Sequence, residues 1–179
     1  ALRGLHDRAM NASNNMSDRK EMLQEALMAQ RQMLVDAIGK RAEDIPQAFT
    51  PYKEVLDVYD QGLELPDDVT IIWPDDNYGY MKRLSSPKEQ KRSGRSGVYY
   101  HSSYLGKPHD HLWMNTVSPT LMYEELRKAY DATADRIWLL NAGDIKSCEF
   151  AVDYFLTMAF DIDAFNFERA ANYRTEWLC

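Results

Sequence analysis

The run Val69-Thr70-Ile71-Ile72-Trp73 is the feature that most constrains the fold, because it is continuous, apolar or β-branched, and closed at once by Pro74. A run of this length that ends at a turn residue is typical of a strand buried on both faces of a sheet. Such strands occur in parallel α/β sheets, where crossover helices cover the faces. The segment therefore predicts an α/β fold.

Strand-like runs recur along the chain and alternate with segments of helical periodicity. Parallel strands need such helical crossovers between them. The fold class expected is therefore α/β, with parallel strands alternating with helices. Five strands suit either an open flavodoxin-like sheet or more than half of an eight-stranded (β/α)8 barrel. The predicted strands lie at residues 2–5, 47–50, 69–73, 97–101 and 136–140.

Capping residues and helix stops mark the predicted helices. Ser17 and Ser118 are predicted N-caps, and Gly39 is a predicted stop. Ser147 is the predicted N-cap of a later helix whose inward side chains are Val152, Phe155, Leu156 and Ala159. The helices expected cover about residues 17–38 and 54–61, a segment from Pro119, a segment after Ser147, and residues 161–178.

Composition excludes several classes of function. The net charge of −7 argues against nucleic acid as a partner, because phosphates attract clustered cations. The basic run 82–95 has no interleaved aromatic residues and is interpreted as a solvated loop. No apolar run approaches the roughly 18 residues of a membrane span. No glycine-rich phosphate loop or nucleophile elbow follows a strand, so no cofactor is expected. A bridge between Cys148 and Cys179 is left open.

Polar residues follow each predicted strand, where α/β folds place their active sites. Glu54 lies beside Tyr52 and Val55, so it could be a carboxylic acid with a raised pKa that donates a proton. A helix-start glutamate stabilised by the helix dipole is the alternative that spacing alone favours. Asp75 and Asp76 cannot both face a site from an extended segment, and an Asx turn is equally compatible with them.

The histidines suggest sugar binding more than metal binding. His109 and His111 could present two imidazoles on one side, and His101 could join them. A zinc site needs three protein ligands, however, and this pair lies in a predicted loop, so no metal is predicted. His101 ends a strand and precedes Tyr104, and polar groups beside aromatic rings suit a carbohydrate pocket.

Two long segments carry a resemblance to a known family. PYKEVLDVYDQGLELPDDVTIIWPDDNYGYMKRL (51–84) and RSGVYYHSSYLGKPHDHLWMNTVSPTLMYEELRKAYDATADRIWLLNAGDIK (95–146) resemble glycoside hydrolase family 115, the xylan α-glucuronidases. The resemblance covers essentially the whole chain. It implies a central (β/α)8 barrel and an activity that removes glucuronic acid, or its 4-O-methyl form, from xylan side chains with inversion.

The resemblance also implies site residues. Glu54 matches the proposed general acid, and Asp75 is the option within the chain for the base, although the base could equally lie upstream. An inverting enzyme holds these groups roughly 6.5–9.5 Å apart. The substrate carboxylate calls for cationic or neutral donors, and Lys53 is one option. The substrate-binding positions implied are Asn77, His101, Tyr104, His6 and Asn141.

The family proteins are several times longer, so the chain is expected to be an internal piece. Residues 1–160 would form part of the catalytic barrel, and 161–179 a helix leading towards the next domain. The resemblance also implies a location outside the cytoplasm. We expect the isolated piece to be inactive and to self-associate through unpaired strand edges. Two alternatives remain: a non-catalytic carbohydrate-binding or scaffold piece, and a metal-dependent barrel hydrolase.

Overall fold

A four-stranded parallel sheet forms the centre of the computed structural model, which describes residues 16–106 and 109–179. The sheet has the order β1-β2-β3-β6, so the strands are adjacent in the order in which the chain forms them. All three pairings are parallel. This is the sequential order found around a barrel wall, as expected. The strands are β1 (Ala48–Phe49), β2 (Thr70–Pro74), β3 (Ser96–His101) and β6 (Trp138–Asn141).

The four predicted strands that fall in the described part of the chain are confirmed, each within a few residues. The prediction for residues 2–5 lies outside the described residues. Buried side chains explain why the middle strands form: Ile71, Trp73 and Val98 are each fully buried. A continuous apolar run therefore did indicate burial on both faces.

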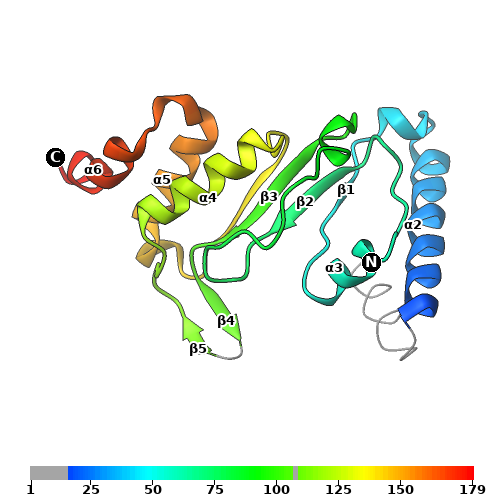
Figure 1. The fold of residues 1–179 in the computed structure, drawn as a ribbon, viewed down its shortest axis with the longest axis horizontal. Helices are drawn as coiled ribbons and strands as arrows, with labels where there is room; N and C mark the ends of the chain where they lie inside the picture. Colours follow the sequence, from blue (N-terminus) through cyan, green and yellow to red (C-terminus); the bar gives the residue numbers. More distant parts are fainter. Residues whose placement is uncertain (1–15, 107–108) are drawn as a thin grey trace.

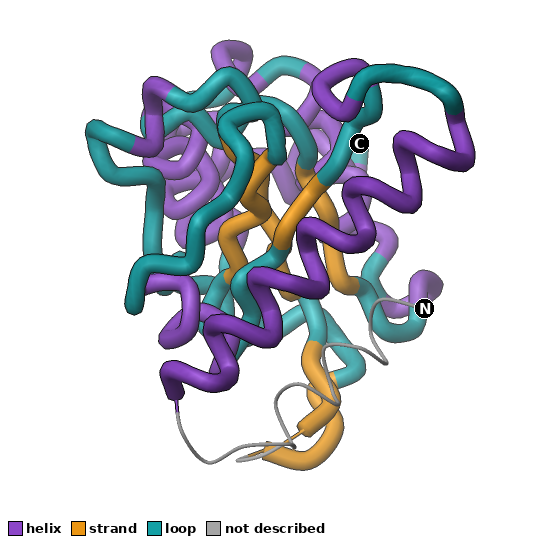
Figure 2. Tube along the Cα trace, turned by 90° about the vertical axis from the view of Figure 1, so that its right-hand side faces the viewer, coloured by secondary structure: helices purple, strands orange, loops and turns teal. Residues whose placement is uncertain are grey.

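The helices lie at the two ends of the sheet (Figure 1). The long helix α2 (Met16–Ile38) and the short helix α3 (Glu54–Asp60) lie beside β1. The helices α4 (Pro119–Asp131), α5 (Glu149–Phe160) and α6 (Phe167–Leu178) lie towards β3 and β6. In Figure 2, α2 crosses in front of the strands. Four 3₁₀ turns complete the described elements: η1 (Ala42–Asp44), η2 (Glu89–Lys91), η3 (Ile145–Ser147) and η4 (Ile162–Ala164).

Several predicted helix ends are confirmed, and one is shifted. The Ser118 hydroxyl accepts a hydrogen bond from the Leu121 N–H at 3.2 Å, and Pro119 opens α4. Gly39 ends α2 in the left-handed region, with φ of 72°. Ser17, in contrast, is the second residue of α2 rather than its N-cap.

The prediction for the start of α5 is wrong. Ser147 ends η3, where its hydroxyl donates to the Asp144 carbonyl at 2.9 Å, and Cys148 occupies the N-cap position. The predicted inward face is confirmed only in part: Phe155 is fully buried and Val152 half-buried, whereas Leu156 is 58% exposed and Ala159 is exposed as well. Tyr154 and Met158 point into the core instead. The apolar sequence of α5 offered more than one inward face.

Two further differences concern short elements. Residues 161–178 form η4 and α6 rather than one helix, because Asp161 and Asn166 each cap a new start with their side chains. An antiparallel hairpin, β4 (Tyr104–Gly106) with β5 (His109–Leu112), occupies a stretch predicted as loop. The hairpin projects beyond the ends of the parallel strands (Figures 1 and 2).

Two apolar clusters hold these elements together. The larger packs β3 and β6 against α4, α5 and α6, and includes Leu126 and Phe155. The smaller packs α2 and α3 against β1 and includes Leu23 and Val58. Burial of such side chains contributes about 1.5–3 kcal/mol each.

We predict that Leu126→Ala lowers the free energy of unfolding of the chain by about 2–5 kcal/mol, because it leaves a cavity in the larger cluster. Leu156→Ala is the matched control, since Leu156 is also a helical leucine but is 58% exposed. Its loss should be about 0.5 kcal/mol. Urea unfolding followed by circular dichroism measures both, and equal losses would contradict the packing of α4.

Candidate functional site

The register of the sheet brings the predicted polar residues together at the carboxyl ends of β2, β3 and β6. His101 is the Cα partner of Asn141, and Tyr99 is the partner of Pro74, which precedes Asp75. Parallel strands end at the same edge, so side chains that follow or close them meet there. The predicted convergence of these strand-end positions follows directly from the pairing.

Asp75 is the most highly connected residue of the site. The residue is 2% exposed. Its carboxylate accepts hydrogen bonds from the backbone N–H groups of Asn77, Gly79 and His101 at 3.0, 3.2 and 3.0 Å. Oδ1 also lies 2.6 Å from His101 Nδ1. Asp75 is therefore both the start of an Asx turn and the partner of a strand-end histidine. The Asx turn is confirmed by this carboxylate, and its part in a functional site stays a prediction.

The contact with Asp75 holds the His101 ring through Nδ1, and Nε2 is the other ring nitrogen. The imidazole is buried and hydrogen-bonded through Nδ1, which donates because the carboxylate can only accept. No group in residues 16–106 or 109–179 hydrogen-bonds Nε2. An orienting carboxylate fixes the tautomer and leaves Nε2 available to a ligand.

Aromatic rings surround His101. Ring centroids of Tyr52, Tyr99 and Tyr104 lie 6.1, 4.7 and 5.8 Å from that of His101. Tyr78 packs edge-on against Tyr104 at 5.8 Å. Burial raises the pKa of Tyr52, so its hydroxyl stays protonated at neutral pH. We call His101, Tyr52, Tyr99 and Tyr104 the aromatic cluster.

Amide side chains complete the rim of this cluster. Asn77 Oδ1 accepts the Tyr52 hydroxyl at 2.7 Å, and Asn77 itself has φ of 75°. Asn141 Nδ2 donates to the Tyr99 hydroxyl at 2.7 Å. Both amides are thus fixed by tyrosines, and such hydroxyl–amide pairs are the groups that hydrogen-bond sugar hydroxyls.

Lys53 and Glu54 lie next to the aromatic cluster in the chain. Lys53 Nζ donates to the Tyr104 hydroxyl at 3.3 Å and lies over the rings of Tyr52 and Tyr104. That hydrogen bond is the largest cause of a raised pKa for Lys53, so the amine is charged at neutral pH. Glu54 is the exposed first residue of α3, and its side chain has no hydrogen bond or ion pair within the described ranges.

Sequence reasoning missed Tyr99 and gave Tyr52 no role of its own. Tyr99 and His101 are two apart on β3, so they share a face, whereas Tyr100 faces the core and is fully buried. Period-two alternation through the strand end was the signal that could have found Tyr99. Tyr52 carried no comparable signal, because it lies in the irregular stretch before α3.

Several other predicted residues lie outside the part of the chain that the structure describes. His6 lies outside the described residues, as do the side chains of His109 and His111. In the remainder of the chain no group of three His, Cys, Asp or Glu could hold a metal ion. Cys148 is buried and Cys179 is exposed, and both are free thiols. No described helix is long and apolar enough to span a membrane.

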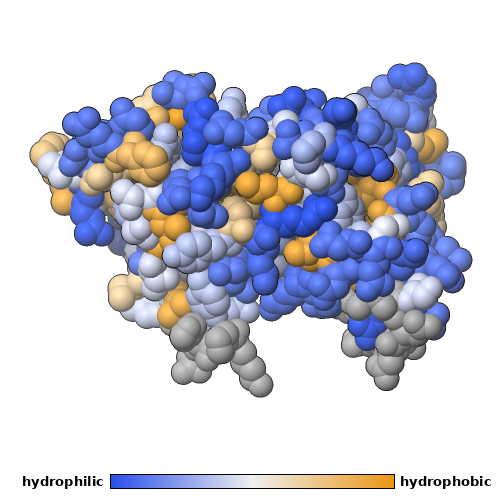
Figure 3. Space-filling model, in the orientation of Figure 1, coloured by the Kyte–Doolittle hydropathy of each residue, from blue (hydrophilic) through white to orange (hydrophobic). Residues whose placement is uncertain are grey.

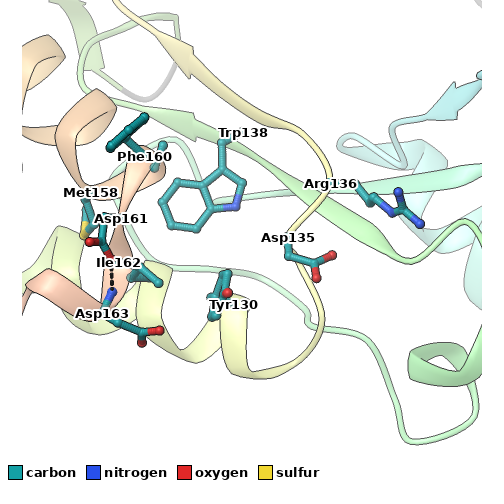
Figure 4. Close-up of a pocket in the computed structure, with 10 residues that line it drawn as sticks. Tyr130, Asp135, Arg136, Trp138, Met158, Phe160, Asp161, Ile162 and Asp163 are labelled. Atoms are coloured by element: carbon teal, nitrogen blue, oxygen red, sulfur yellow. Dashed lines mark hydrogen bonds between the residues drawn. The ribbon is translucent and has the colours of Figure 1, made fainter.

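A cavity of about 490 Å³ lies away from the aromatic cluster. Figure 4 shows Trp138 in its wall, with Met158 and Phe160 on one side and Asp135 on the other. Asp135 precedes β6, so this cavity opens at the amino end of the strand, opposite His101 and Asn141. In barrel folds that end serves stability rather than chemistry.

Comparison with known proteins gives a family match and a similar solved structure. The family model of glycosyl hydrolase family 115 matches residues 1–179. The chain is similar to a solved structure described as a novel family GH115 4-O-methyl-α-glucuronidase, BtGH115A, with specificity for decorated arabinogalactans. The identity is 44% and the TM-score 0.82, over 85% of this chain and 20% of that chain. This chain thus spans about a fifth of that relative's length. No curated protein matches it.

We predict that Asp75→Ala lowers the free energy of unfolding by about 3–5 kcal/mol, because it leaves buried N–H groups and His101 Nδ1 without their acceptor. Asp76→Ala, at the neighbouring residue, is the matched control. Asp76 accepts only the N–H groups of Tyr78 and Tyr80 near the surface, so its loss should be about 1 kcal/mol. Thermal unfolding of both variants measures this, and similar losses would contradict the central role of Asp75.

Proposed function

Because the chain belongs to glycoside hydrolase family 115, we propose that its parent protein hydrolyses α-1,2-linked glucuronic acid, or its 4-O-methyl form, from xylan side chains. The observation that carries the proposal is the aromatic cluster, in which tyrosine rings and an aspartate-oriented histidine meet at the strand ends. Aromatic faces stack on sugar rings, and the histidine and amides bind hydroxyls. The 44% identical relative, a 4-O-methyl-α-glucuronidase, supports the same chemistry.

In this proposal Glu54 is the general acid of an inverting reaction. It would protonate the glycosidic oxygen while a base activates water on the other face of the sugar. Glu54 opens α3 directly after Tyr52, which belongs to the aromatic cluster, and Lys53, which donates a hydrogen bond to Tyr104 of that cluster. The acid would therefore stand next to the groups that hold the sugar.

In this proposal the general base of the reaction lies outside this chain. Asp75 remains the option within it, but both of its oxygens already accept N–H groups, so a water molecule would compete with buried hydrogen bonds. Its contacts favour a positioning role, in which Asp75 orients His101 towards the substrate. The relative extends well beyond the matched segment, which leaves ample chain for a base.

The proposal also names the polymer from which the glucuronic acid is released. Xylan is the polymer that the sequence resemblance implies, whereas the relative is described as specific for decorated arabinogalactans. Release of 4-O-methylglucuronic acid by the parent protein should therefore be measured on both polymers. Release from xylan supports the full proposal. Release from arabinogalactan alone would keep the glycosidase and replace its polymer.

A non-catalytic carbohydrate-binding piece is the second candidate. The observation in its favour is that Glu54 is exposed and has no partner within the described ranges. A proton donor in a closed site would be desolvated by its surroundings or substrate. Substitution of Glu54 in the parent protein separates the two candidates.

We predict that Glu54→Gln in the parent protein lowers kcat by about 10²–10⁴-fold, because the amide cannot donate the acid proton. Sugar binding should persist, since the aromatic cluster is untouched. The measurement is release of 4-O-methylglucuronic acid from glucuronoxylan, with binding of the same oligosaccharide followed by calorimetry.

Asp57→Asn provides the control for this variant. Asp57 is another exposed acid on α3 and loses the same charge. It should leave kcat within about twofold, because surface substitutions away from the chemistry have small effects. Wild-type activity in Glu54→Gln would remove Glu54 from the mechanism, and a parent protein that binds but never cleaves would favour the second candidate.

We also propose that the isolated 179-residue chain self-associates and releases no glucuronic acid. Among the described strands β6 pairs with β3 alone, and its Leu139 is 46% exposed. Phe160, the last residue of α5, is 93% exposed. Figure 3 shows hydrophobic patches among hydrophilic residues over the α5 and α6 end. An unpaired edge with apolar neighbours invites pairing with another chain.

Light scattering over a wide concentration range tests this prediction. We expect a mass above the 20.8 kDa of one chain, rising with concentration. Substitution of Leu139 and Phe160 by lysine should shift the chain towards the monomer. A stable monomer without binding of an apolar dye would contradict self-association, and turnover by the isolated chain would contradict its inactivity.

A further inference from the structure

The helix that begins at Glu54 depends on other elements for its position. α3 has seven residues, and helices this short are marginal without tertiary contacts. Its N-cap residue, Lys53, makes no side-chain capping hydrogen bond and has φ of 52°, a region that side chains rarely adopt. Glu54 is exposed and has no partner within the described ranges, so its carboxyl group lies wherever the helix places it.

Apolar burial holds α3 against the sheet but does not fix its orientation. Val55 and Val58 are 2% and 0% exposed and belong to the smaller apolar cluster. Burial of this kind is non-directional, so it tolerates small rotations and shifts of a short helix. The directional contacts of α3 lie at its last turn, at Tyr59 and Asp60.

Arg83 makes most of these directional contacts. Its Nε lies 3.1 Å from Asp60 Oδ1, and its guanidinium carbon lies 5.3 Å from the Tyr59 ring centroid. The same carbon lies 4.5 Å from the ring centroid of Trp73, which is fully buried on β2. Nη1 and Nη2 donate to the Glu89 carboxylate at 3.0 and 3.2 Å. One side chain therefore joins α3, β2 and η2, and we call these five residues the arginine clamp.

Glu89 completes the arginine clamp on the helix side. It accepts the Tyr59 hydroxyl at 2.8 Å and the backbone N–H of Ser86 at 2.7 Å. Burial alone would raise the pKa of Glu89, but hydrogen bonds from Ser86, Tyr59 and Arg83 outweigh burial and lower that pKa. The carboxylate is therefore charged at neutral pH. A planar guanidinium suits such a partner, because its edge donates to a carboxylate while its face lies over a ring.

We propose that Arg83 is a positioning residue of the glycosidase reaction, which fixes the last turn of α3 and thereby sets where Glu54 presents its proton. This inference rests on the proposed function, because it takes the role of Glu54 from there. At a rise of roughly 1.5 Å per residue α3 is about 10 Å long, so a tilt at its last turn displaces its first turn. A misplacement of about 1 Å can lower a rate about 100-fold.

Turnover of glucuronoxylan by the full parent protein measures the effect. Arg83→Met removes the guanidinium and keeps an apolar side chain beside Trp73. It should lower kcat about 10- to 100-fold and leave KM within about twofold, because the aromatic cluster lies outside the arginine clamp. Arg83→Lys should not restore kcat, because an ammonium group cannot make the bidentate and stacked contacts together.

Arg127→Met is the matched control. Arg127 also forms two ion pairs and lies over a tyrosine ring, and its side chain is 32% exposed against 27% for Arg83. It belongs to α4, at the other end of the sheet from α3 (Figure 1), so kcat should stay within about twofold. On α3 itself, Asp60→Asn should lower kcat, whereas the equal loss of charge in Asp57→Asn should not.

A double mutant separates positioning from a loss of folded protein. If Arg83 acts through Glu54, Arg83→Met should lower kcat no further in a Glu54→Gln background. A loss of folded protein would lower the rate by the same factor in both backgrounds, and that result overturns the inference. It is also overturned if Arg83→Met leaves kcat unchanged while Glu54→Gln lowers it, an outcome that keeps the proposed function.

Hydrogen exchange of the parent protein tests the arginine clamp without turnover. Arg83→Met should speed exchange of the α3 amides about 10- to 100-fold and leave the α4 amides unchanged, as expected when charge-assisted hydrogen bonds are lost locally. Unchanged exchange in α3 overturns the inference whatever the activity. Faster exchange in α3, in a parent protein that cleaves neither xylan nor arabinogalactan, keeps the clamp and refutes the proposed function together with the catalytic role of Arg83.

Discussion

The buried carboxylate of Asp75 is the interaction on which the rest of the site depends. It follows β2, yet it accepts the backbone N–H of His101 at the end of β3 and two N–H groups of its own turn. A buried charge is tolerated only where such donors surround it. The carboxylate therefore joins two strand ends and a turn into one unit, and none of the three can move without exposing an unsatisfied group.

The side chains of the aromatic cluster are fixed in place by that unit. With the His101 ring fixed through Nδ1, Tyr52 and Tyr99 pack against a surface that cannot rotate. The amides of Asn77 and Asn141 then hold the tyrosine hydroxyls. A binding surface whose side chains are held by a second layer loses little entropy when a ligand arrives. The strand ends thus provide a preformed platform rather than a loose set of polar groups.

Sequence reasoning reached the sheet and most of this site, for reasons that particular residues make clear. The strand ending at Pro74 and the strand ending at His101 were predictable, because burial on both faces leaves a continuous apolar run. The β4–β5 hairpin was not, since HSSYLGKPHDHL has no strand-like alternation. The start of α5 was missed because Ser147 bonds backward to Asp144 instead of forward into the helix. Local competition of this kind is decided by geometry that the sequence does not display.

Backbone strain was the feature least visible from sequence, because single residues with positive φ leave no pattern in the sequence. Among the described residues, the non-glycine positions with positive φ are Lys53, Asn77, Arg95 and Thr133. The latter two lie in the turns that precede β3 and β6, where Arg95 pairs with Asp135. The former two direct their side chains to Tyr104 and Tyr52. Strain that a turn explains needs no ligand, whereas at Lys53 and Asn77 the strained residues also carry the polar groups of the site. The backbone there is held in place by the surrounding contacts, and its cost is set against the placement of a cation and an amide beside the aromatic cluster.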